Sequence, residues 1–254
     1  MSLSSRKNYT TVTGKSGQTS KINLGRAGKH IIAAVLIVIT FFTSIFPIVS
    51  FAFETFLPNP GDYSFLYTGD ADNLTVKWWT TDENITENGM YGQKGILHNE
   101  TIWHAFRGTI LVSVCCSLLA GTIGTMIGYA VSKTRRSRWA NYVNAVAFLP
   151  YLMPSLAVGV AFFVFGSSMG IFNTYLLLVL AGTVKYIPFA SRSALSSMMQ
   201  LSGEIEEAAI IQDIPWHKRM LNIIIPIQKS SIMSGYLLPF ITCVRELTLF
   251  MLLC

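Results

Sequence analysis

Charged residues are scarce in this chain: Asp, Glu, Lys and Arg make up only 13% of its 254 residues, whereas 51% are hydrophobic. A soluble domain carries about 25% charged residues. The mean hydropathy of +0.47 points the same way and argues against a water-soluble domain. The net charge of +6 does not indicate nucleic acid, because the basic residues cluster only in segments that flank apolar stretches.

Cysteine and the common motifs of metal sites and catalysis are also sparse. The four cysteines lie inside apolar stretches, without the paired spacing of a zinc site or a CxxC redox motif. The four histidines are scattered, and neither an HExxH motif nor a pair of intramembrane carboxylates occurs. The sequence therefore predicts no metal site, no cofactor and no catalytic residue, and an intramembrane enzyme is the least favoured class.

Long apolar stretches are the dominant feature that is present. A bilayer core requires about 20 apolar residues in a helix, and lipid leaves no other way for one segment to satisfy its backbone polar groups. Five stretches meet this length, so the predicted fold class is an all-α membrane protein with five transmembrane helices. They cover residues 31–56, 109–131, 142–165, 171–190 and 232–253.

Three features inside these stretches are informative. Pro150 and Pro154 predict a kink in the third stretch, with a hinge or plain structural bending as alternatives. Lys185 is expected to extend its stem toward the cytoplasmic interface. Arg245 and Glu246 are costly near mid-span, so we expect them to line a pathway or to form polar contacts between helices.

The distribution of Lys and Arg predicts the orientation. The head, residues 1–30, has six basic residues and no acid, which places it in the cytoplasm. The connector 57–104 has seven acids and two lysines, so we expect it outside the cell. The first stretch, 31–56, is longer than the apolar core of a signal peptide, which favours a retained helix. The remaining residues, 105–254, form the predicted transmembrane core.

A cytoplasmic loop within this core, residues 203–226, is predicted to contain two short helices. The first turn of the first helix is rich in acidic residues, which the helix dipole favours at an N-terminus. Pro215 suits the first turn of the second helix. Ala208 and Ala209 present a slim face that another surface can approach closely, and Trp216 offers an apolar anchor. The loop is therefore predicted to be an elbow that contacts a partner.

The spacing within this elbow resembles the signature of type I ABC transporter permeases, which reads Glu-Ala-Ala, three residues, Gly, nine residues, Ile, any residue, Leu, Pro. The matching residues are Glu207, Ala208, Ala209, Asp213, Ile223, Ile225 and Pro226. Asp213 at the glycine position is the main departure. A turn there requires a positive φ, which costs a non-glycine residue about 1 kcal/mol.

The resemblance extends over most of the chain and is greatest to the C-terminal half of fused permeases for ferric iron transport. YTTVTGKSG at 9–17 is similar to their interdomain linker, PGDYSFL at 60–66 to the start of their outer connector, and RELTLFMLL at 245–253 to their penultimate span. Such proteins continue into one more span. The resemblance therefore predicts that this chain is a fragment or a truncated product.

The family implies a transport subunit of an ATP-driven importer in the bacterial inner (plasma) membrane. Two permease halves form the pathway, separate ABC ATPase subunits hydrolyse ATP and grip the elbows, and an extracytoplasmic binding protein delivers the substrate. Ferric iron is the leading cargo, and polyamine or organophosphonate importers are the alternatives. A passive channel or a membrane scaffold is the alternative from another class.

Overall fold

The computed structural model describes residues 25–59, 61, 63, 74–85, 92–134 and 137–254, and most of the basic head and the linker-like segment 9–17 lie outside them. The regular secondary structure of the described residues is helical. One isolated antiparallel β-bridge joins Ile85 and Gln93. The prediction of an all-α membrane protein is confirmed. The described residues divide into two compact units, one up to residue 105 and the other from residue 106 to 254.

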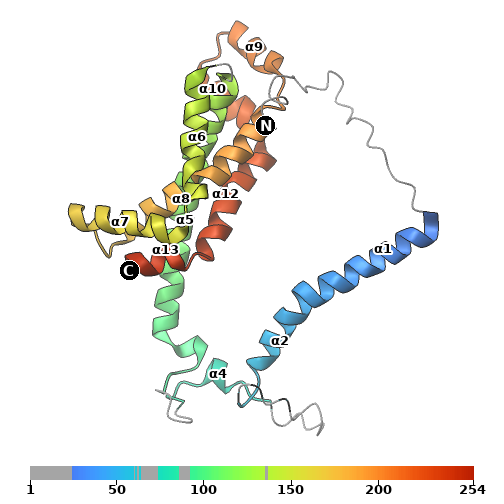
Figure 1. The fold of residues 1–254 in the computed structure, drawn as a ribbon, viewed down its shortest axis with the longest axis vertical. Helices are drawn as coiled ribbons and strands as arrows, with labels where there is room; N and C mark the ends of the chain where they lie inside the picture. The colour runs from blue at the N-terminus through green and yellow to red at the C-terminus, as the bar shows by residue number, and fades with distance from the viewer. Residues whose placement is uncertain (1–24, 60, 62, 64–73, 86–91, 135–136) are drawn as a thin grey trace. The chain divides into compact units, whose positions relative to one another are not determined.

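The first unit contains an apolar helical rod that coincides with the first predicted stretch. It consists of α1 (Gly25–Thr40), a π-helical turn η2 (Phe41–Ile45) and α2 (Phe46–Glu54), seen in blue in Figure 1. Residues 27–54 are long and apolar enough to cross a membrane. Large apolar side chains are exposed all along the rod, as expected for a helix that faces lipid or another membrane helix.

The acidic connector follows in the same unit and has a small folded centre. Its helical turns are α4 (Lys77–Thr80) and η4 (Ile96–His98). Leu57 is 2% exposed, and its carbonyl accepts a hydrogen bond of 2.8 Å from the indole N–H of Trp78. Asn99 ends the connector as a helix cap, because its side-chain oxygen accepts from the backbone N–H groups of Thr101 and Ile102.

The second unit is a helical bundle arranged around one helix. Its helices are α5 (Glu100–Lys133), α6 (Arg138–Leu152), α7 (Ser155–Met169), α8 (Tyr175–Met198), α9 (Gly203–Ile211), α10 (Trp216–Arg219), η5 (Met220–Ile224), α11 (Ile225–Ile227), α12 (Lys229–Val244) and α13 (Thr248–Leu253). Helix α8 packs against α6, α7, α12 and α13, and is the central helix of the bundle (Figure 1).

Glycines let α5 and α8 approach closely. A Cβ atom at Gly124 would lie 2.5 Å from the Cβ atom of Ala190, and one at Gly128 would lie 2.7 Å from that of Ala194. Both distances are shorter than side chains tolerate, so only glycine fits at these two positions. The small-residue spacing of Gly124 and Gly128 thus serves helix packing, as the sequence pattern indicates.

Two of the five predicted stretches are broken helices in the structure, and the first of these breaks lies at the kink that Pro150 and Pro154 predict. The third stretch is two helices, α6 and α7, bent by 102° around residues 153 and 154. The fifth stretch is also two helices, because α12 ends at Val244 and α13 begins at Thr248. By length and composition, the described residues provide two spanning helices, 27–54 and 100–133, or three if the bent pair counts as one span.

Candidate functional site: the elbow after the central helix

The elbow begins five residues after α8 and consists of α9, a tight turn, α10, the π-helical turn η5 and α11. Its second helix starts after Pro215, whose φ of −63° is compatible with a helix N-terminus. The predicted pair of short helices is therefore present at the predicted place. The motif residues Ile223 and Ile225 are half-buried in its second arm, and Pro226 is exposed there.

Asp213 ends α9 in a left-handed conformation, with a φ of +52°. The N–H group of Asp213 donates to the carbonyl of Ile210 over 2.9 Å, and the N–H group of Ile214 donates to the carbonyl of Ala209 over 3.1 Å. These two bonds form a Schellman motif with Asp213 at the position that glycine usually occupies. The geometry explains why the family signature carries glycine here and why Asp, which tolerates this region better than most residues, can replace it.

The two faces of α9 differ in exposure. Ala209 is 5% exposed and packs inward, whereas Glu207 and Ala208 face outward. Apolar side chains are also exposed around them: Ile211 is 82% exposed and Trp216 is 43% exposed. The outward surface of the elbow therefore combines an acid, a small residue and exposed apolar side chains.

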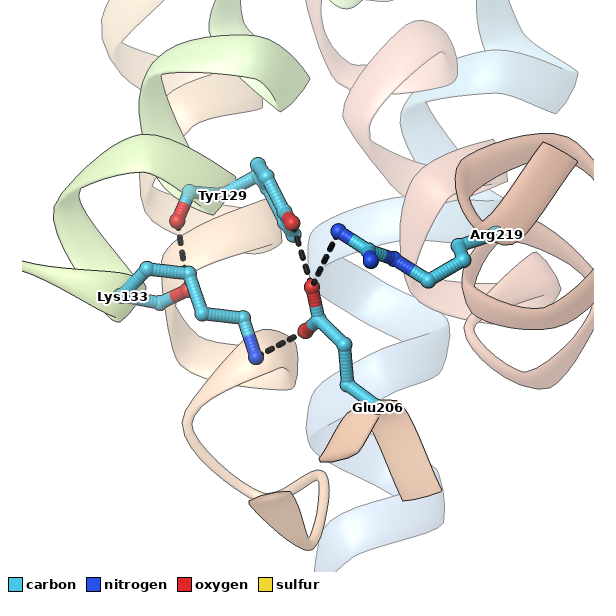
Figure 2. A network of polar contacts seen from close by, with 5 residues as sticks. Tyr129, Lys133, Glu206 and Arg219 are labelled. Carbon is cyan, nitrogen blue, oxygen red and sulfur yellow. Dashed lines mark hydrogen bonds and ion pairs between the residues drawn. The ribbon is translucent and has the colours of Figure 1, made fainter. Parts of the chain in front are cut away.

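Glu206 fixes the inward face of the elbow to the end of α5, as Figure 2 shows. The Tyr129 hydroxyl donates to Oε1 of Glu206 over 2.6 Å, and the Lys133 ammonium forms an ion pair with Oε2. On the other side, Nη2 of Arg219, from α10, lies 3.9 Å from Oε1. One carboxylate, whose side chain is only 6% exposed, thus links α5, α9 and α10.

Two opposing effects set the pKa of Glu206. Burial raises the pKa of this carboxyl, but the hydrogen bonds from Lys133 and Tyr129 and the positive charges of Lys133 and Arg219 outweigh it. The net pKa of Glu206 therefore lies below its ordinary value, and the side chain is a carboxylate at neutral pH. The network is a charged clamp that links both arms of the elbow to α5.

The sequence motif directs attention to Glu207 and misses Glu206. A signal for Glu206 does exist, because Glu206 and Ala209 are three residues apart and therefore share one face of α9. That signal cannot say which face is inward. The deciding partners, Tyr129 and Lys133, lie more than seventy residues earlier in the chain, and Glu206 and Tyr129 are separated by 77 positions.

The structure places Arg245 and Glu246 at the break between α12 and α13 rather than inside a continuous helix. Oε2 of Glu246 accepts a hydrogen bond of 2.8 Å from the Tyr186 hydroxyl on α8, and Oε1 accepts from the N–H group of Leu249 at 3.2 Å. Glu246 thus joins two helices, while Arg245 is exposed. The lining of a pathway by this pair stays a prediction.

The expectation that Lys185 reaches the cytoplasmic interface is wrong. This residue is 9% exposed, and its ammonium donates to the carbonyls of Met153 at 2.5 Å and Pro150 at 3.4 Å. Pro150 lies in the last turn of α6, and Pro154 immediately precedes α7. The bend therefore leaves carbonyls without helical donors, and Lys185 satisfies them.

One sequence pattern of catalysis occurs by coincidence. Residues 166–170 read GSSMG, which matches the GxSxG pattern of serine hydrolases, where the serine lies on a turn between a strand and a helix. Here the segment ends α7: Gly170 has a φ of +70°, and the Ser168 hydroxyl donates to the carbonyl of Phe165. The described residues also contain no cluster of three His, Cys, Asp or Glu side chains able to hold a metal ion.

Comparisons with known proteins point to one class. No family model matches the chain. It is 27% identical over 139 residues to the inner membrane ABC transporter permease protein YcjP of Escherichia coli (strain K12), a match that covers 54% of this chain and 48% of that protein. It is 23% identical over 150 residues to the molybdate/tungstate transport system permease protein WtpB of Pyrococcus abyssi, covering 59% of this chain and 60% of the relative.

A third relative is the phosphate transport system permease protein PstA 1 of Mycobacterium tuberculosis, 25% identical over 176 residues, which cover 66% of this chain and 54% of that protein. The chain spans about half the length of the curated relatives it matches. The similarity is thus to ABC transporter permeases, in agreement with the resemblance carried by the elbow.

Proposed function

We propose that this chain is a transmembrane permease subunit of an ATP-driven ABC importer and that its elbow receives the movement of a separate ATPase. The elbow geometry is the observation that carries the proposal. The Glu-Ala-Ala spacing lies on a pair of short helices that expose Glu207 and Ala208 and that Glu206 clamps to α5. A rigid arm with an exposed contact face suits a part that transmits force.

The assembly proposed around it follows from the same class. ABC ATPase subunits bind the elbow from the cytoplasm, a second permease half completes the pathway, and an extracytoplasmic binding protein docks on the connector 57–104. The location is the bacterial inner membrane, with residues 1–30 in the cytoplasm, the first helix over 31–56 and the permease core over 105–254. The fused ferric iron permeases support a second half that precedes this one in the same polypeptide.

The resemblance to ferric iron permeases favours ferric iron as cargo, with polyamines and organophosphonates as alternatives. The names of two relatives refer to molybdate or tungstate and to phosphate, which adds oxyanions as candidates. Uptake of radiolabelled ferric iron, putrescine, an alkylphosphonate, molybdate and phosphate by cells with and without the complete gene distinguishes these cargoes. ATP-dependent accumulation of one of them supports the importer, and flux that persists without ATP favours a passive channel.

Charge reversal at the elbow tests the coupling itself. In the assembled transporter in liposomes, we expect Glu207→Lys to abolish the stimulation of ATP hydrolysis by the loaded binding protein while membrane insertion stays normal. Glu207→Asp is the matched control, because it keeps the negative charge at the same exposed position. Full stimulation in Glu207→Lys would refute the proposed role of the elbow.

A further inference from the structure

Two consecutive residues of α8, Lys185 and Tyr186, donate hydrogen bonds at the two helix breaks of the bundle. Lys185 donates to the carbonyls of Pro150 and Met153 at the α6–α7 bend. Tyr186, 3% exposed, donates to Oε2 of Glu246 at the α12–α13 break and, over 3.5 Å, to the carbonyl of Thr242. Neighbouring residues of a helix point about 100° apart, so one turn of α8 reaches two different neighbours.

At each break, these contacts support backbone groups that lack a helical partner. Pro154 has no N–H group, so the end of α6 cannot continue its hydrogen bonds into α7. An apolar medium makes such unsatisfied carbonyls costly, and irregular backbone at membrane depth persists only where the protein itself supplies donors. Lys185 supplies them at one bend. At the other, Glu246 accepts from the N–H group of Leu249 and is held in place by Tyr186.

The same helix also leads to the elbow. Helix α8 ends at Met198, and α9 begins at Gly203. Beyond Tyr186, the cytoplasmic half of α8 is joined to α12 by the Ser193 hydroxyl, which donates to the carbonyl of Ser231 over 2.9 Å. A displacement of the elbow therefore acts on a helix that is bonded to both breaks.

We propose that Lys185 and Tyr186 are positioning residues that couple the two bends to α8, so that a movement of the elbow changes both bends together. This inference rests on the proposed function for the source of the movement. The tethering itself is a property of the chain alone. In an importer the two bends would be the points at which the bundle rearranges, with α8 as their common support.

The tether is tested first without any ATPase. Spin labels on the exposed positions Tyr142 and Met169 report the α6–α7 bend, and labels on Met233 and Met251 report the α12–α13 break. In nanodiscs, Lys185→Met should broaden the first distance distribution and leave the second narrow, and Tyr186→Phe should do the reverse. Lys185→Arg, which keeps the donors, should restore the first distribution. Narrow distributions in both variants would overturn the tether.

The coupling is tested in the assembled transporter. We expect the number of ATP molecules hydrolysed per transported substrate to rise severalfold in Lys185→Met, because the bend is no longer tied to α8, and to recover in Lys185→Arg. A residue with only a structural role would lower the yield and thermal stability but leave this ratio unchanged in the folded fraction, and that result would overturn the inference. Failure of the unmodified chain to bind an ATPase would instead refute the proposed function, while the distance measurements would still decide the tether.

Discussion

Asp213 holds a backbone conformation that glycine adopts without steric cost. Its φ of +52° lies in the left-handed region, which costs an L-residue about 1–2 kcal/mol. We therefore expect Asp213→Gly to stabilise the end of α9, less the extra backbone entropy of glycine in the unfolded chain, by about 0.5–1 kcal/mol. Slower hydrogen exchange of the Ile214 N–H group, which donates to Ala209, is the measurement.

A β-branched residue provides the contrast at the same position. Asp213→Val should accelerate exchange of the Ile214 N–H group, because valine adopts the left-handed region far less readily than Asp. If Asp213→Gly and Asp213→Val change the exchange rate in the same direction, the Schellman motif does not control the stability of the turn.

Glu206 makes the stability of the elbow depend on pH. Its pKa in the folded chain lies below the ordinary value of 4.5, because bonds and charges from Lys133, Tyr129 and Arg219 outweigh the effect of burial. The carboxylate therefore contributes its full stabilisation above about pH 4.5 and loses it as the pH falls through the lower folded-state pKa. We expect Glu206→Gln to cost about 2 kcal/mol at pH 7, the scale of charged hydrogen bonds.

Limited proteolysis of the elbow across the pH range measures this effect. At pH 7, the Glu206→Gln chain should be cleaved faster than the parent chain, and the difference should shrink as the pH falls below 4.5. Glu204→Gln is the matched control, since this exposed residue lies in the same first turn of α9. Equal cleavage of the parent and Glu206→Gln at pH 7 would show that the clamp does not hold the elbow.

At the scale of whole helices, α5 and α8 pack so closely at Gly124 that no larger side chain fits between them. A Cβ atom at Gly124 would lie 2.8 Å from the backbone nitrogen of Ser191 as well as close to Ala190, so the helices must separate to admit it. We expect Gly124→Ala to lower the stability of the bundle by about 1–3 kcal/mol, despite the higher helix propensity of alanine. The thermal unfolding midpoint in detergent checks this expectation.

Gly203→Ala is the control for the same substitution in open space. A Cβ atom at Gly203 would make only an ordinary contact of 3.7 Å with Glu207. Its midpoint should stay unchanged or rise slightly, because alanine favours the first turn of α9. Equal midpoints for Gly124→Ala and Gly203→Ala would mean that α5 and α8 are not packed as closely as described.

The limits of the sequence are clearest where helices break. Two prolines predict a kink in the third stretch, but they do not predict a bend of 102°, because the partner that stabilises the bend, Lys185, lies 32 to 35 residues away. The break at Arg245 and Glu246 has no proline of its own. Its visible sign is the pair of charges, which a continuous helix in lipid would disfavour.

The elbow shows the opposite case, because its secondary structure is set mostly by interactions between residues close in the sequence. Capping, turn and helix preferences between residues 203 and 226 depend on neighbours in the sequence, so the two short helices and the strained turn at Asp213 could be predicted. The clamp at Glu206 could not, since it depends on how α5 packs beside α9. Local chemistry thus predicts the shape of the elbow, and tertiary packing decides how it is attached.

For the molecule as a whole, the charge distribution predicts that the acidic connector and the elbow lie on opposite sides of the membrane. The orientation rule counts Lys and Arg, and acids contribute little to it. The connector has two lysines in 48 residues, whereas Lys218 and Arg219 lie in the 24-residue elbow, beside four acids, and Lys133 ends α5. Basic residues are retained on the cytoplasmic side of membrane helices, so these three should face the cytoplasm. Exposed positions on each side allow a direct measurement.

Single cysteines at Glu83 and Lys218 make this measurement, because both side chains are exposed. The background chain carries Cys115→Ser and Cys254→Ser, since these two native cysteines are not buried, whereas Cys116 and Cys243 are buried. We expect a membrane-impermeant maleimide to label Glu83→Cys in intact spheroplasts and Lys218→Cys only in inverted vesicles, because the apolar stretches between them separate two aqueous compartments. Labelling of both positions from the same side would place the elbow out of reach of a cytoplasmic ATPase and would remove the basis for its proposed role in transport.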